Sequence, residues 1–146
     1  MGRSTKLLGA LVIGAVTLLP VAQANEQDDK DVIEYRQRIM HTLNAQAAIL
    51  GQIVSGLIPK DDVVAHLDAI ALTASTALKS FEPKVPGGES KDEVWANWDD
   101  FSERMGNFAK RAAEATKVVD TLGPDAALTS MLEAMSCKGC HQIYRE

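Results

Sequence analysis

The chain has 146 residues, which fits one domain and is too short for a TIM barrel or a two-domain nucleotide enzyme. Its 15 Lys and Arg residues against 20 Asp and Glu give a formal net charge of −5, which disfavours a nucleic-acid role driven by phosphate neutralisation. Apolar residues reach 46%, which argues against disorder, but seven aromatic residues are few for a chain that builds its core alone. The composition therefore predicts one small acidic domain in which something besides side chains fills the core.

The first 24 residues have the pattern of a cleaved secretory signal peptide. Arg3 and Lys6 precede an apolar run over residues 7–19, and residues 22–24 form the small-x-small ending that signal peptidase favours. The run is shorter than the ~20 residues of a spanning helix, so a membrane anchor is the weaker alternative. Cleavage after Ala24 would leave residues 25–146 as the mature domain and remove two positive charges, moving the net charge from −5 to −7. A small exported domain without a membrane attachment is expected in the periplasm, if the source is a Gram-negative bacterium.

The first half of the mature chain predicts two amphipathic helices. Apolar residues three and four apart predict one helix from Asp31 to about Gly56, with a buried stripe that includes Val54 and Leu57. A second helix is expected from about Asp61, whose carboxylate suits a helix N-terminus, to Leu78. The following residues, 81–88, are rich in Pro and Gly and predict a loop.

The second half predicts two more helices. Ser90-Lys91-Asp92-Glu93 has the pattern of a capping box, which would open a third helix reaching about Val119. Residues 122–125 interrupt it, and Pro124 suits the first turn of a fourth helix that runs to the C-terminus. No segment alternates strictly enough to predict a strand. Four amphipathic helices joined mostly by short connections predict an all-α fold, an antiparallel four-helix bundle.

The strongest motif is Cys137-Lys138-Gly139-Cys140-His141, which contains both cysteines of the chain. Thiols at i and i+3 lie along one edge of a helix, where they can add to the two vinyl groups of haem. The histidine that follows can place its imidazole beneath the iron. The pattern C-x-x-C-H therefore indicates covalent attachment of one haem c, with Cys137 and Cys140 as thioether anchors and His141 as iron ligand.

Three alternatives explain the same cysteines less well. A thioredoxin-like C-x-x-C normally lies in a βαβ pattern, whereas this motif closes an all-helical chain. A tetrahedral zinc site needs four ligands, and only His41 and His66 are left to join these three. A disulfide between residues three apart would close a very small loop and stabilise the fold little. Haem also accounts for the scarcity of aromatic residues, since the macrocycle is itself a large apolar plate.

The motif and its surroundings resemble the cytochrome c′ family and its low-spin, Met-ligated relatives. The C-terminal match extends from the haem motif to Tyr144 and Arg145, and residues 35–40, Tyr-Arg-Gln-x-x-Met, are similar to the first-helix signature of the family. Trp95 and Phe101 fall where the third helix of the family carries aromatic residues. The resemblance spans the mature chain and implies a haem-binding four-helix bundle.

The resemblance also implies roles for three further residues. Met40 takes the position that faces the distal side of the iron, where a thioether would fill the sixth site and give a low-spin carrier of one electron. If Met40 only packs over the iron, the site is five-coordinate and binds NO or CO. Arg36 resembles the arginine that approaches a haem propionate, with an exposed surface charge as the equal alternative. Arg145 resembles the arginine that shapes the proximal pocket.

Other methionines and histidines, and the motifs of common enzyme classes, are less informative. Met131 and Met135 precede the motif on the same predicted helix, so they are not expected to reach the distal face, and His41 is expected to be exposed rather than a ligand. No paired-carboxylate, Ser-His or phosphate-loop pattern indicates an enzyme. The expected partners are redox proteins. The resemblance also implies that two copies of the chain can form a homodimer through their first two helices.

Overall fold

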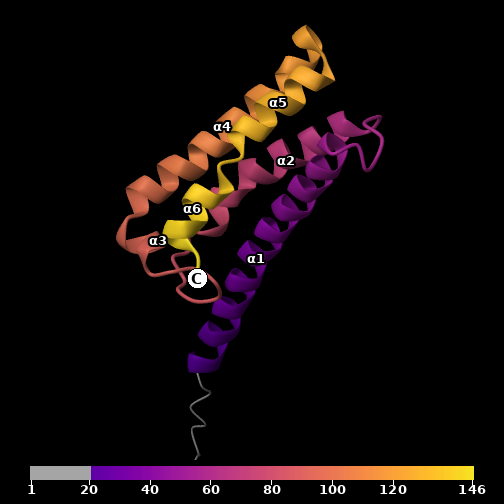
Figure 1. The fold of residues 1–146 in the computed structure, drawn as a ribbon. Coiled ribbons are helices and arrows are strands. Elements are labelled where there is room, and N and C mark those ends of the chain that lie inside the picture. The colour runs from indigo at the N-terminus through magenta and orange to yellow at the C-terminus, as the bar shows by residue number, and fades with distance from the viewer. Residues whose placement is uncertain (1–20) are drawn as a thin grey trace, which may run out of the picture.

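The computed structural model describes residues 21–146, and Figure 1 shows that this part of the chain is a bundle of helices. In chain order its elements are α1 (Val21–Val54), α2 (Val63–Ala77), the 3₁₀ turn η1 (Leu78–Ser80), α3 (Glu93–Ala96), α4 (Trp98–Leu122), α5 (Pro124–Ala134) and α6 (Cys137–Tyr144). Between residues 21 and 146 there is no strand, only two isolated β-bridges. The predicted all-α four-helix bundle is confirmed, with α5 and α6 together forming the fourth leg.

Most of the predicted signal peptide, residues 1–20, lies outside the described residues. Residues 21–24 are helical and continuous with the rest of α1, so the helix includes the predicted cleavage point after Ala24. None of the described helices is long and apolar enough to cross a membrane.

The predicted third helix is two helices, because the chain leaves the helical conformation at Asn97 (φ −119°, ψ 47°). Asn favours such breaks, since its side chain competes with the helical backbone for hydrogen bonds. The predicted capping box is wrong: α3 begins after Asp92, and no side chain caps it by a hydrogen bond. Ser90 is instead bridged to the C-terminal segment.

The predicted fourth helix is also two helices. Met135 (φ −82°, ψ 71°) ends α5, and Ser136 (ψ 47°) precedes the first turn of α6. Ser is frequent at the position immediately before a helix, so Ser136 is the residue of the sequence that could have indicated this break. The expectation that Met135 shares a helix with the haem motif is therefore wrong, and the motif opens a short helix of its own.

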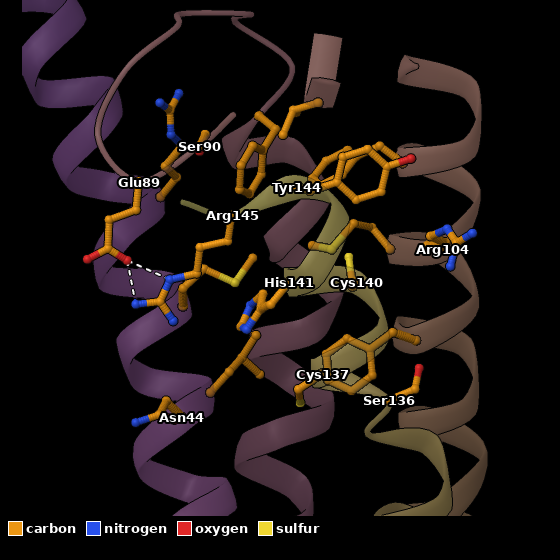
Figure 2. A pocket seen from close by; sticks show the side chains of 18 of the residues that line it. Asn44, Glu89, Ser90, Arg104, Ser136, Cys137, Cys140, His141, Tyr144 and Arg145 are labelled. Carbon is orange, nitrogen blue, oxygen red and sulfur yellow. Dashed lines mark hydrogen bonds and ion pairs between the residues drawn. The ribbon is translucent and has the colours of Figure 1, made fainter. Parts of the chain in front are cut away.

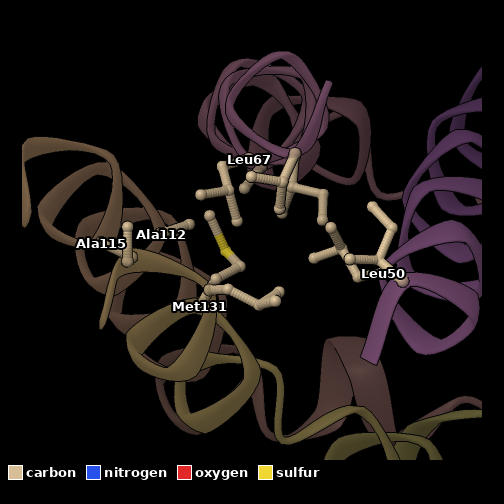
Figure 3. Close-up of a cluster of buried hydrophobic side chains, with 11 residues drawn as sticks. Leu50, Leu67, Ala112, Ala115 and Met131 are labelled. Carbon is tan, nitrogen blue, oxygen red and sulfur yellow. The ribbon is translucent and has the colours of Figure 1, made fainter. Parts of the chain in front are cut away.

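The buried residues form two clusters along the bundle. The first, shown in Figure 3, joins α1, α2, α4 and α5 through residues such as Leu50, Leu67, Ala112, Ala115 and Met131. The second lies towards α3 and α6 and is more aromatic; it contains Ala77, Phe81, Val94, Phe101, Met105 and Tyr144. Small alanines in the first cluster let the helix axes approach closely, whereas the second cluster borders open space between α1 and α6.

The stripe predicted for the first helix is wrong at its C-terminal end. Val54 is 57% exposed and Leu57 is 75% exposed, while Ile53 is the buried residue of that turn at 7%. The helix ends at Val54, so Leu57 lies beyond it and no longer follows the helical period.

The segment after η1 is held against α1 and against the C-terminus. Gly88 has a positive φ of 64°, and a Cβ there would lie 2.9 Å from Cγ2 of Ile33 on α1, so only glycine allows this approach. On the other side Ser90 bridges Arg145, and the Glu146 amide donates to the Glu89 carbonyl at 3.0 Å. The C-terminal residues are therefore tied into the fold rather than left as a free tail.

Candidate functional site

A cavity of about 510 Å³ opens between α1, α4 and α6, beside the aromatic cluster. All six residues predicted for the site line it: Arg36, Met40, Cys137, Cys140, His141 and Arg145. They come from the two ends of the chain, and the fold brings α1 and α6 to the same space (Figure 2). The scarcity of aromatic residues in the sequence thus corresponds to an open volume in the bundle.

The two thiols of the motif lie on the first turn of α6. Both cysteines are free; Cys137 is exposed and Cys140 is half-buried. Burial raises the pKa of the Cys140 thiol. Because the two residues are three apart on a helix, both thiols lie at the edge of the cavity, as attachment to one planar ligand requires.

His141 follows on the same helix, and its imidazole points from α6 towards α1 in Figure 2. Burial lowers the pKa of His141; the charge of Arg145 lowers it further and that of Glu89 raises it. A neutral imidazole is the form that binds a metal, so this surrounding favours the ligating state. Both charges act on the ring, which makes Arg145 and Glu89 part of its electrostatic environment.

The walls of the cavity suit a flat apolar group. Polar and charged side chains also line the cavity, and its apolar walls include Leu43, Ala47, Phe81, Val94, Phe101, Met105, Phe108 and Met135. Met40 lies half-buried on α1, and Asn44 lies one turn further along the same helix. Two thiols, an imidazole, a thioether and apolar walls match the donor set and the surface of haem c.

Arg36 is buried, with 1% of its surface exposed, so the alternative of an ordinary surface charge is wrong. Its Nη1 donates to the Val85 carbonyl and its Nη2 to the Gly87 carbonyl, each at 2.5 Å. The guanidinium also lies 5.5 Å from the ring centre of Phe81 and 5.2 Å from that of Trp95. These contacts fasten α1 to the loop after η1.

Replacing Arg36 by Gln is expected to lower the free energy of unfolding by about 2–3 kcal/mol, because two partly buried hydrogen bonds from a buried guanidinium are lost. Denaturant unfolding of the variant and its parent measures this difference. Arg38→Gln is the matched control on the same helix: Arg38 is exposed and forms a surface ion pair with Glu34, so a loss below about 0.5 kcal/mol is expected. If both variants lost the same amount of unfolding free energy, the contacts of Arg36 with the loop after η1 would not stabilise the fold as proposed.

The sequence reasoning missed two charged groups at the cavity, Glu89 and Arg104. Arg104 Nε donates to Asp100 at 2.6 Å, and the Tyr144 hydroxyl donates to the same carboxylate. The hydrogen bond from Arg104, followed by that from Tyr144, lowers the pKa of Asp100. The i, i+4 spacing of Asp100 and Arg104 was a visible signal, whereas Glu89 lies in a loop without any helical period.

The described residues do not form the zinc site considered as an alternative. Within residues 21–146 no three His, Cys, Asp or Glu side chains group closely enough to hold a metal ion. His41 is exposed, as predicted, although it reaches the rim of the cavity. His66 is half-buried, its Nδ1 lies 2.8 Å from Oε1 of Gln46, and it is not among the residues that line the cavity.

Comparison with known proteins shows the family of the chain. The family model described as cytochrome c′ matches residues 31–145. Cytochrome c-556 of Agrobacterium tumefaciens is 31% identical over 121 residues, covering 77% of this chain and 95% of the relative. Cytochrome c′ of Pararhodospirillum photometricum is 29% identical over 121 residues, covering 78% and 95%.

The fold is also similar to solved structures. A nitrosyl complex of a variant of cytochrome c prime from Alcaligenes xylosoxidans has a TM-score of 0.72 at 22% identity, covering 81% of this chain and 97% of that one. Cytochrome c prime from Shewanella frigidimarina has a TM-score of 0.69 at 23% identity, covering 81% and 96%. The chain belongs to the cytochrome c′ family, whose members carry a covalently attached haem c.

Proposed function

We propose that this protein is a carrier of one electron in which Cys137 and Cys140 form thioethers to haem c, and His141 and Met40 are the iron ligands. Haem iron with His and Met ligands cycles between the ferric and ferrous states without a change of ligand, and its potential is raised by the thioether. The chain would supply the attachment, the two ligands and an apolar enclosure. No enzymatic activity is part of this proposal.

The observation that carries the proposal is that Met40 of α1 and His141 of α6 line one cavity. The other two thioethers in its lining are placed less well for the distal side. Met135 lies at the C-terminal end of α5, two residues before Cys137, and Met105 is 7% exposed within the aromatic cluster. Met40 is the thioether that comes from the helix across the cavity from α6.

A second function is binding of NO or CO at an open sixth site, with Met40 packed over the distal face. It is favoured by the neighbours solved as nitrosyl complexes, which share the fold with this chain. In that case Met40 would act as a steric wall, and the size of the distal space would set which gases enter. The two functions differ in one bond, that between Met40 and the iron.

The absorption spectrum of the ferrous protein, recorded with and without CO, distinguishes the two functions. A sharp low-spin α band that CO leaves unchanged is expected if Met40 is a ligand, because a filled sixth site excludes the gas. A high-spin spectrum that CO converts would contradict the carrier function and support gas binding. A protein matured with its haem-attachment machinery that shows no haem absorbance would contradict both.

The proposal extends to location and partners. Export by the predicted signal peptide would place the carrier in a periplasm, where haem c is attached and a redox partner protein would exchange the electron. A homodimer remains a prediction from the family resemblance, and the mass of the protein in solution would test it.

A further inference from the structure

The segment that follows η1 connects the two walls of the cavity. On one side the carbonyls of Val85 and Gly87 accept hydrogen bonds from Arg36 of α1. On the other side the backbone of residues 89–91 pairs with the C-terminal residues: Lys91 N donates to the Tyr144 carbonyl at 3.0 Å, and Glu146 N donates to the Glu89 carbonyl at 3.0 Å. The helix that carries Met40 and the helix that carries His141 are therefore joined through this segment.

Glu89 adds a side-chain contact to these backbone bonds. Its Oε2 lies 2.7 Å from Nε and 2.5 Å from Nη2 of Arg145, so the guanidinium is held by two of its nitrogens (Figure 2). Both side chains line the cavity beside His141. Figure 2 shows the Arg145 guanidinium and the His141 imidazole both directed towards α1.

We propose that Glu89 is a positioning residue for the haem iron: it fixes the Arg145 guanidinium beside His141 and neutralises that positive charge. The inference rests on the proposed role of His141 as iron ligand and not on that of Met40. Glu89 lies in the loop after η1, outside the C-x-x-C-H motif.

Charges near the iron shift the balance between its ferric and ferrous states. A cation next to the proximal ligand disfavours the ferric state, which carries one positive charge more than the ferrous state. An anion paired with that cation cancels most of this effect. The side chains of Arg145 and Glu89 are 47% and 55% exposed, so solvent weakens each charge without removing it. The net influence of the intact pair on the iron is therefore small, while either charge alone should be detectable.

The test is the reduction potential of the holoprotein in a double-mutant cycle. Glu89→Gln removes the anion and is expected to favour reduction about threefold, which is a rise of about 28 mV at 59 mV per tenfold for one electron. Arg145→Gln removes the cation and is expected to shift the potential down by a similar amount. The double variant carries neither charge and is expected to return close to the parent. Glu89→Asp keeps the negative charge, so its reduction potential is expected to lie close to that of the parent.

Glu82→Gln is the matched control, because Glu82 is an exposed carboxylate in the same segment and lies outside the cavity lining. A rise in potential for Glu89→Gln no larger than for Glu82→Gln would overturn the proposal, whatever the change in stability. Shifts of the same sign for Glu89→Gln and Arg145→Gln would also overturn it, since a structural disturbance and not charge would then explain them.

The spectrum of the parent separates this result from the proposed function. A high-spin ferrous parent would remove Met40 as a ligand but leave the potential comparison valid, because His141 remains the proximal ligand in both forms. Opposite shifts that cancel in the double variant would then still support the role of Glu89.

Discussion

Replacing Cys137 and Cys140 together by Ser is expected to abolish covalent attachment of haem. Each thioether requires a sulfur that adds to one vinyl group, and a serine hydroxyl does not replace it. The described residues contain no other cysteine, and neither does the rest of the sequence. Any haem that remains would be held only by its iron ligands and the apolar walls, without a covalent bond to the chain, and denaturation would release it.

Haem staining after denaturing electrophoresis measures this loss, and the intact mass of the denatured protein confirms it. Cys137→Ser and Cys140→Ser as single variants are the controls, since each keeps one thioether and should retain covalent haem with an α band moved from that of the parent. Covalent haem on the doubly substituted chain would contradict the assignment of both anchors.

The variant Met40→Leu is expected to change the ferrous protein from low-spin to high-spin and to open the iron to CO. Leu has nearly the volume of Met, so the packing cost should stay below about 1.5 kcal/mol while the thioether is lost. If Met40 occupies the sixth site more than about nine-tenths of the time, its removal raises the apparent affinity for CO at least about tenfold. The ferrous spectrum and a CO titration measure both effects.

Met135→Leu is the matched control. Met135 lines the same cavity beside the haem motif, and the substitution removes a thioether in the same way. Its spectrum and CO affinity are expected to equal those of the parent. A Met40→Leu protein that cannot be told from the parent would contradict ligation by Met40, and a spectral change in Met135→Leu would indicate that the wrong thioether was assigned.

The local sequence pattern predicted the helices well and their breaks poorly. Apolar residues at three-and-four spacing reflect burial along each helix, so the four legs of the bundle could be placed from the chain alone. The breaks at Asn97 and at Met135 interrupt helices whose apolar period continues on both sides. Such breaks depend on what the short pieces pack against, and α3 contacts α6, a helix more than forty residues later.

Arg36 illustrates the same limit at the site. Its place one turn before Met40 was visible in the sequence, but the two readings of it, an exposed charge or a propionate partner, could not be separated. The structure buries the guanidinium between Phe81 and Trp95 and satisfies it with the carbonyls of a loop about fifty residues away. No local pattern encodes a side chain that bonds to distant backbone.

The sequence by itself determined the C-x-x-C-H motif and the helical class, because short spacing and helical periodicity are properties of neighbouring residues. Arg36, Met40 and Arg145 became candidates only through the resemblance to the cytochrome c′ family. Only the tertiary structure decided that the six candidate residues share one cavity, that Arg36 serves the loop, and that Glu89 pairs with Arg145 beside His141. The reason is physical: such contacts join residues distant in the chain, and they form only when α1, the loop and the C-terminus fold against one another.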